Sequence, residues 1–92
     1  HHLGRHEQAV VAYRQALDLY RQQGNRYGEA ETLIHLGDTY QVLGDHDAVQ
    51  TAWLTALSIL DKLDHPDADH VRTKLADLDQ TTPENEEHHR KA

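Results

Sequence analysis

The fold of this chain of 92 residues can be inferred from residues 30–56, AETLIHLGDTYQVLGDHDAVQTAWLTA. Apolar and small residues recur in it at three- and four-residue steps on both sides of the pair Gly44-Asp45. That spacing places the apolar side chains on one face of a helix, and a glycine followed by an aspartate is typical of the point where one helix ends and the next begins. The stretch therefore predicts two helices joined by a short turn.

The same pattern occurs a second time toward the N-terminus, displaced by 40 residues. Leu3-Gly4 aligns with the identical pair Leu43-Gly44. Tyr13 aligns with Trp53, so a large aromatic residue is kept at this position although the residue type differs. A fixed period near this length is typical of stacked helical repeats.

Further turn residues at Gly24-Asn25 and Asp64-His65-Pro66 divide the remainder of the chain. We expect an all-α fold of antiparallel helix-turn-helix repeats, an α-solenoid fragment with helices at about 5–22, 28–42, 46–62 and 67–79. These would form one repeat segment, 1–79, made of a partial repeat 1–24, a full repeat 28–62 and a capping helix 67–79. Residues 80–92 are charged and nearly free of apolar side chains, which predicts a disordered tail.

Composition narrows the classes of function. A net charge of −7, with nine histidines counted as neutral, argues against direct contact with nucleic acid, which needs a basic surface. No apolar run is long enough for a membrane span. The absence of cysteine fits a reducing compartment, so we expect a cytoplasmic protein. The chain begins without methionine, which suggests a piece excised from a longer protein.

One whole repeat of the chain resembles the tetratricopeptide repeat, through Ala30, Leu33, Leu36-Gly37, Tyr40, Leu43-Gly44, Trp53 and Ala56. The resemblance implies stacked helix pairs that bind proteins. It also implies that Gly37 lets the second helix approach the first, and that Ala52 and Ala56 admit the aromatic side chains. Val49 departs from the pattern, since a small alanine is usual there. Asp61 replaces the usual proline, which would lengthen the second helix and the period beyond the usual value of about 34 residues.

A narrower resemblance rests on the linker Gly24-Asn25-Arg26-Tyr27-Gly28-Glu29-Ala30 and on residues 67–75. Together they look like the C-terminal repeats of actinobacterial SARP-type transcriptional regulators. This implies a bacterial protein-interaction or regulatory module, joined in the parent protein to a DNA-binding region. The competing interpretation is a structural or self-assembly segment of an unrelated multidomain protein with no ligand of its own.

No motif for catalysis, a cofactor or a metal is present in the sequence. His6-Glu7 lacks a second histidine four residues later because Val10 stands there, so the metalloprotease helix motif fails. Ser58, the only serine, has no glycine elbow. The histidines lack the spacing of converging zinc ligands, and we expect them to be solvated. The sequence therefore predicts no enzyme, no cofactor and no metal site.

The resemblance to the tetratricopeptide repeat implies that the helix at 28–42 lines the concave groove, where a partner would bind. With its packing residues set aside, the groove side falls to Glu31, Ile34, His35, Asp38, Gln41 and Val42. This face has two carboxylates and no lysine or arginine, which favours a protein or peptide segment that is basic or apolar.

The helix at 5–22 is expected to have one uncovered face, made of Ala9, Ala12, Tyr13 and Ala16. These residues align with Val49, Ala52, Trp53 and Ala56, which are expected to pack on the helix at 28–42. Because uncovered apolar surface is unfavourable in water, we expect a homodimer that pairs through this end.

Overall fold

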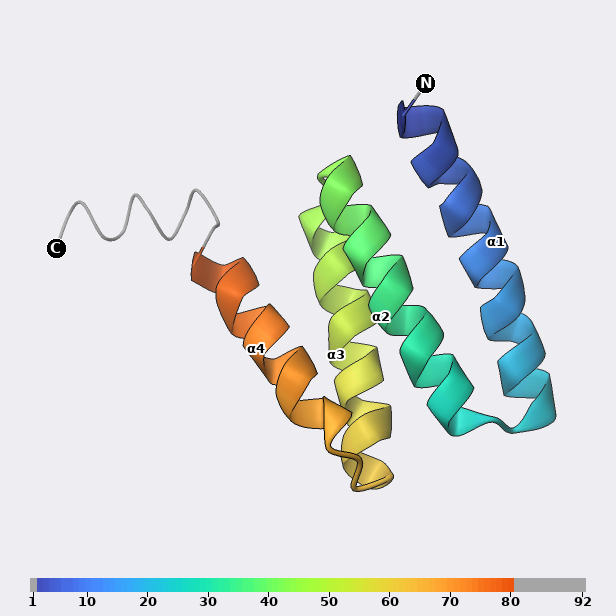
Figure 1. Cartoon of the computed structure of the whole chain (residues 1–92), viewed down its shortest axis with the longest axis vertical. Coiled ribbons are helices and arrows are strands. Elements are labelled where there is room, and N and C mark those ends of the chain that lie inside the picture. Colours follow the sequence, from blue (N-terminus) through green and yellow to red (C-terminus); the bar gives the residue numbers. More distant parts are fainter. Residues whose placement is uncertain (1, 81–92) are drawn as a thin grey trace, which may run out of the picture.

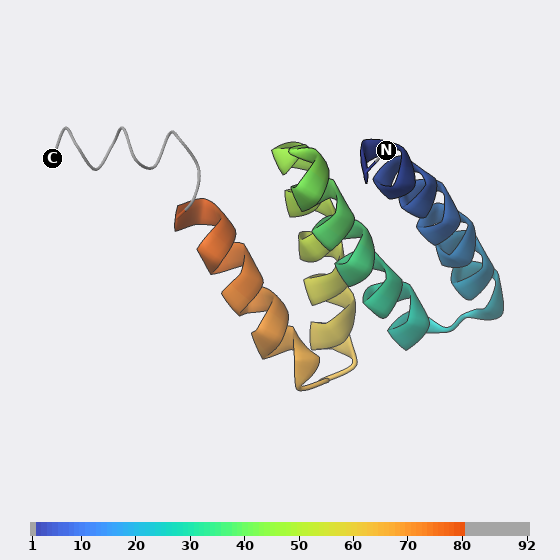
Figure 2. The ribbon, with the colours of Figure 1, turned by 45° about the horizontal axis from the view of Figure 1, so that its top comes forward.

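The computed structural model describes residues 2–80, and the helices of this range follow one another in a row (Figure 1). They are α1 (His2–Gln23), α2 (Arg26–Leu43), α3 (His46–Lys62) and α4 (Asp67–Gln80). Each runs antiparallel to the one before it; α2 lies between α1 and α3, and α4 packs against α3 (Figure 2). Residues 2–80 contain no strand, and the all-α fold class is confirmed. Apart from Gln80, the tail expected at 80–92 lies outside the described residues.

The first two turns are built alike, because each pairs a glycine with a residue that can cap a helix. Gly24 and Gly44 have φ angles of 70° and 82°, in the left-handed region that glycine enters without steric cost. The side chain of the next residue accepts a hydrogen bond from the backbone N–H three residues later, at 2.9 Å for Asn25 and 3.2 Å for Asp45. The two turns thus stop one helix and start the next in the same way.

Two helices begin earlier than the sequence pattern predicts. Gly4 is helical, unlike its aligned counterpart Gly44, so α1 begins at His2 instead of near residue 5. Asn25 is the N-cap of α2, which therefore begins at Arg26 instead of at residue 28. The repeat alignment alone did not distinguish a helical glycine from one that ends a helix.

The core lies between α2 and α3 and is closed by α4. Its most completely buried large side chains are Trp53, Leu60 and Val49 from α3 and Val71 from α4. The apolar stripe of α4 that faces this core consists of Ala68, Val71 and Leu78, which are spaced to share one helix face. From α1 only Leu17 belongs to the buried set among the described residues.

Trp53 packs directly on the backbone of α2 at Gly37. A Cβ added at Gly37 would lie 2.2 Å from Trp53 Nε1, which is too close for two non-bonded atoms. The indole N–H donates to the carbonyl oxygen of Ile34 at 3.2 Å, so the buried polar atom is satisfied. Ala52 and Ala56, one on each side of Trp53 along α3, are also buried. This agrees with the roles that the sequence pattern implied for Gly37 and the two alanines.

We expect Gly37→Ala to destabilise the chain despite the better helix propensity of alanine. Overpacking costs about 1–3 kcal/mol, whereas the propensity gain is about 0.5–1 kcal/mol. Urea unfolding followed by circular dichroism measures the difference. Gly4→Ala is the matched control, because its added Cβ has no neighbour within 4 Å apart from adjacent residues and nearby backbone of its own helix. A Gly37→Ala variant as stable as the parent would contradict the packing described above.

Candidate protein-interaction surfaces

The six residues expected to line the groove share one face of α2, here called the front face. It is defined by Glu31, Ile34, His35, Asp38, Gln41 and Val42. At about 100° per residue, this face lies opposite the positions of Leu33, Leu36 and Tyr40. Glu31, His35, Gln41 and Val42 are exposed, whereas Ile34 and Asp38 are half-buried. The structure therefore brings all six together, but not all of them are equally accessible.

Two front-face residues take part in packing. The carbonyl oxygen of Ile34 receives the Trp53 indole N–H, and the Ile34 side chain packs against the core. The His35 ring stacks on Tyr13 of α1, with ring centroids 5.9 Å apart and an interplanar angle of 14°. These contacts tie α2 to both of its neighbours, so Ile34 and His35 have structural roles in addition to any contact with a partner.

A cation from α4 reaches the front face. Lys74 Nζ lies 2.8 Å from Asp38 Oδ1 and 5.0 Å from the centroid of a Trp53 ring. The sequence of α2 suggested a face without lysine or arginine, but Lys74 supplies one from outside that helix. The charge of Asp38 is therefore balanced within the chain, and Glu31 remains as the front-face carboxylate without an ion pair among residues 2–80.

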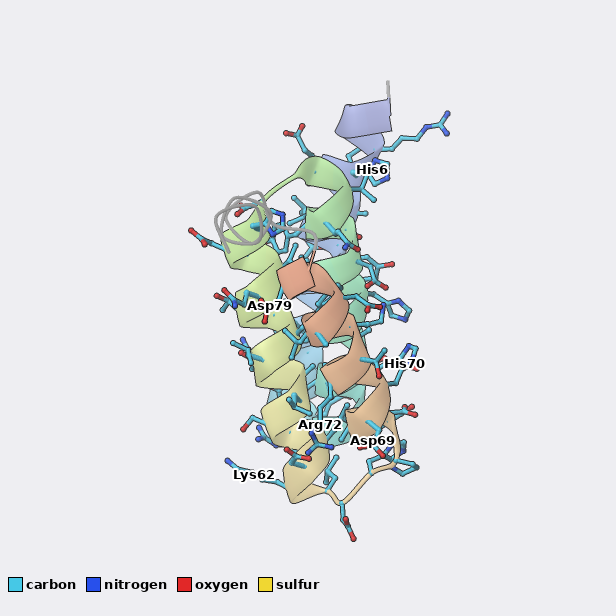
Figure 3. The ribbon with its side chains drawn as sticks, turned by 90° about the vertical axis from the view of Figure 1, so that its left-hand side faces the viewer. His6, Lys62, Asp69, His70, Arg72 and Asp79 are labelled. Atoms are coloured by element: carbon cyan, nitrogen blue, oxygen red, sulfur yellow. The ribbon has the colours of Figure 1, made fainter. Side chains whose placement is uncertain are left out.

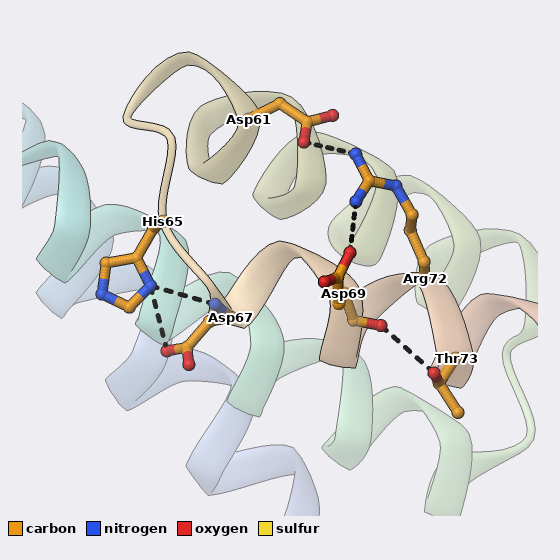
Figure 4. Close-up of polar contacts among 6 residues, drawn as sticks. All are labelled: Asp61, His65, Asp67, Asp69, Arg72 and Thr73. Carbon is orange, nitrogen blue, oxygen red and sulfur yellow. Dashed lines mark hydrogen bonds and ion pairs between the residues drawn. The ribbon is translucent and has the colours of Figure 1, made fainter.

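A second polar contact joins α2 to the start of α4. The Tyr27 hydroxyl donates to Asp67 Oδ2 at 3.2 Å, and the Tyr27 and His65 rings lie 4.8 Å apart. His65 Nδ1 accepts from the Asp67 backbone N–H at 3.1 Å (Figure 4). The hydrogen bond to Asp67, and then the charge of that carboxylate, raises the pKa of Tyr27 above its usual value.

The end of α3 is tied to α4 by an arginine. Arg72 donates to Asp61 of α3 and to Asp69 of its own helix (Figure 4). His70 projects from α4 toward the side on which α2 lies (Figure 3). Lys62, at the end of α3, projects from the opposite side of the molecule (Figure 3). Within residues 2–80, no three histidines or carboxylates are grouped as metal ligands.

The uncovered face expected on α1, here called the α1 seam, consists of Ala9, Ala12, Tyr13 and Ala16. Ala12 is exposed and the other three are half-buried. Their aligned positions in α3 are all buried, and Trp53 retains only 1% of its exposure. One turn further along, Leu19 is 56% exposed where the aligned Ile59 is 3% exposed. The same sequence positions are thus fully buried in α3 and only partly covered in α1.

A cleft of about 640 Å³ opens between α1 and α3 over α2, and we call it the rear cleft. Leu33, Leu36 and Tyr40 of α2 form its floor, so it lies on the side of α2 opposite the front face. Its α1 wall includes Arg14, Asp18 and Arg21; its α3 wall and mouth include Asp45, Asp47, Ala48, Thr51, Ala52 and Thr55. None of the residues predicted as site residues lines it. The spacing of Arg14, Asp18 and Arg21 shows in the sequence that they share one face of a helix. The residues that face them across the cleft follow only from the packing of the helices.

The row of antiparallel helices, with exposed side chains on both sides of α2, defines a helical-repeat scaffold. The family model of the tetratricopeptide repeat matches residues 1–62, and the chain belongs to this family. Its members generally mediate protein–protein interactions, and such repeats are typically non-catalytic. No curated protein and no solved structure matches the chain significantly. No helix within residues 2–80 has the length and apolar character needed to cross a membrane.

We predict that the Tyr27 contact is present at neutral pH and is lost in alkaline solution. Because the folded-state pKa of Tyr27 is raised, its stabilising effect is full below the usual tyrosine pKa of about 10 and disappears as pH rises through the folded-state value. The ¹³Cζ shift of Tyr27 followed against pH measures this pKa. Asp67→Ala should lower it, whereas Asp77→Ala, in the same helix, should leave it unchanged. Equal titration in the parent and Asp67→Ala would refute the assignment.

Proposed function

We propose that this chain is a protein-interaction or regulatory module whose front face binds a basic or apolar peptide segment. The observation that carries the proposal is an apolar and acidic face of α2 on which Glu31, Gln41 and Val42 stay exposed. Val42 is 61% exposed there, beside the exposed Gln41, and Glu31 lies at the other end of the same face. A solvated apolar side chain gains by burial against a partner, while a nearby carboxylate attracts a cation.

The charges around the front face favour a particular arrangement of the partner. Its lysine or arginine lies beside Glu31, and its apolar side chains lie on Val42. Asp38 keeps Lys74 as its partner, so it contributes little attraction of its own. A net charge of −7 opposes contact with nucleic acid by this segment.

The parent protein, we further propose, is a larger cytoplasmic bacterial transcriptional regulator. The resemblance of residues 24–30 and 67–75 to the repeats of SARP-type regulators supports this proposal. The coding sequence upstream of His1 provides the test. A DNA-binding domain encoded there is the expected result, and an upstream region that encodes a different class of protein would overturn the assignment.

Charge reversal at Glu31 tests the front face. We expect Glu31→Lys to weaken binding of a synthetic lysine- and leucine-rich peptide by roughly three- to tenfold, because attraction becomes repulsion. Its melting temperature should stay near that of the parent, since Glu31 is exposed and has no ion pair among the described residues. Asp18→Lys, which makes the same change in net charge on the rear cleft, is the matched control. Equal affinity of both variants for the peptide would exclude front-face binding.

A second candidate function, self-association, is favoured by the exposure of the α1 seam. We propose that two copies pair through Ala9, Ala12, Tyr13 and Ala16. The small side chains of this seam allow close approach of a second helix, as Ala52 and Ala56 do within the chain. Leu19, exposed at the edge of the seam, adds apolar area to such a contact.

Sedimentation over a wide concentration range tests the homodimer. We expect a concentration-dependent dimer in the parent and a monomer in Ala12→Glu, because a charge in the centre of a dry helix contact is unfavourable. Val11→Glu is the control, since Val11 is exposed on a different face of α1 and should not affect pairing. A parent that remains monomeric at every concentration would refute self-association.

A further inference from the structure

The rear cleft has walls of opposite charge. The α1 wall presents Arg14 and Arg21, and the α3 side presents Asp45 and Asp47. Asp18 lies between the two arginines and lowers the positive charge of the α1 wall without cancelling it. This asymmetry sets the cleft apart from the front face, where Glu31 carries the unbalanced charge.

The charged side chains of the cleft are only partly neutralised by ion pairs within the chain. Arg14 Nη2 donates at 2.6 Å to the hydroxyl of Tyr40, which is neutral and leaves the guanidinium charge unbalanced. Arg21 lies 3.0 Å from Glu29, a carboxylate that it shares with Arg26 at 3.1 Å. One carboxylate thus balances two arginines at that end. Arg14 and Arg21 therefore both retain positive charge that is available to an external carboxylate.

The aspartates lie at the end of the cleft near Arg14. Asp45 is placed there by its backbone N–H, which donates at 3.1 Å to the carbonyl oxygen of Tyr40. Tyr40 also holds Arg14, so the cation and the aspartates face each other across the same end of the cleft. Asp47, in the first turn of α3, has no ion pair among residues 2–80. A cation of a partner would therefore meet the α3 side at this end.

The spacing of the arginines selects the form of the partner. Arg14 and Arg21 are seven residues apart on α1, which is two helical turns or about 10.5 Å. Carboxylates two turns apart on a second helix that lies along the cleft have the same spacing. The floor between the walls is apolar, with Leu33 and Leu36 below and Ala48 beside them. The volume of about 640 Å³ over this floor is large enough for several apolar side chains from one face of such a helix.

We propose that the rear cleft binds an amphipathic helix of a partner protein with oppositely charged flanks. Its apolar stripe rests on Leu33 and Leu36, two carboxylates on one flank meet Arg14 and Arg21, and a lysine or arginine on the other flank meets Asp47. This proposal rests on the protein-interaction role proposed above, but it places this partner on the opposite side of α2 from the front face. The charge pattern also fixes the direction in which the helix lies.

Three synthetic helical peptides with the same leucine stripe test the proposal on the full chain. One has glutamates two turns apart on one flank and lysines on the other, one has lysines only, and one has glutamates only. Backbone amide shifts in ¹H–¹⁵N spectra report both affinity and location. We expect the mixed-charge peptide to bind about tenfold more tightly than either of the others, with its largest shifts at Leu33, Leu36 and Ala52.

Two variants locate the binding. Thr51→Trp fills the cleft from an exposed position and should weaken binding of the mixed-charge peptide by about tenfold, whereas Gln50→Trp, at the neighbouring exposed position outside the cleft, should not. Arg14→Glu, which leaves the cleft open, should weaken it roughly threefold and provides the test if Thr51→Trp does not fold.

The outcomes separate this proposal from the front-face proposal. Shifts centred on Glu31 and Val42 instead of the cleft would overturn the rear-cleft assignment and leave front-face binding intact. No shifts with any of the three peptides, or unchanged affinity in Arg14→Glu, would also overturn it. Cleft shifts that disappear in Thr51→Trp and persist in Gln50→Trp would support it, whatever the result for Glu31→Lys.

Discussion

The contact of Trp53 with the backbone of α2 at Gly37 holds the three C-terminal helices together. The indole occupies the space where any other residue would have a side chain, and its N–H is bound to the Ile34 carbonyl. The ring is 1% exposed, so its burial removes a large apolar area from water, and the hydrogen bond offsets the cost of desolvating its one polar atom. This contact fixes the distance between α2 and α3, and Lys74 over the indole links it to α4.

The position of α2 between α1 and α3 gives the molecule two separate surfaces. One side of α2 keeps the exposed Glu31 and Val42, and the opposite side forms the floor of the cleft between the neighbouring helices. The two surfaces differ in charge, since a carboxylate dominates the first and walls of opposite sign enclose the second. The two proposed sites therefore suit partners of different chemistry.

The sequence predicted the helices, the family and the role of Gly37, because each depends on spacing within a single repeat. It placed the six front-face residues on one side of α2 for the same reason. It missed the Asp38–Lys74 pair because the two residues are far apart in the chain and meet only through the packing of α4 on α3. The rear cleft was missed for a related reason: Arg14, Leu36 and Thr51 come from three helices, and their juxtaposition requires the crossing geometry. Gly4 remained helical where its aligned Gly44 ends a helix, which repeat alignment cannot distinguish.

Hydrogen exchange at the Trp53 indole N–H tests the central contact most directly. Trp53 is the single tryptophan of the chain, so its indole proton gives one isolated signal in ¹H–¹⁵N spectra. If the indole is clamped between Gly37 and the Ile34 carbonyl, this proton should exchange as slowly as the backbone amides in the middle of α2 and α3, since only global unfolding would release it. Exchange as fast as that of a solvated indole, in a chain whose helical amides remain protected, would contradict the account.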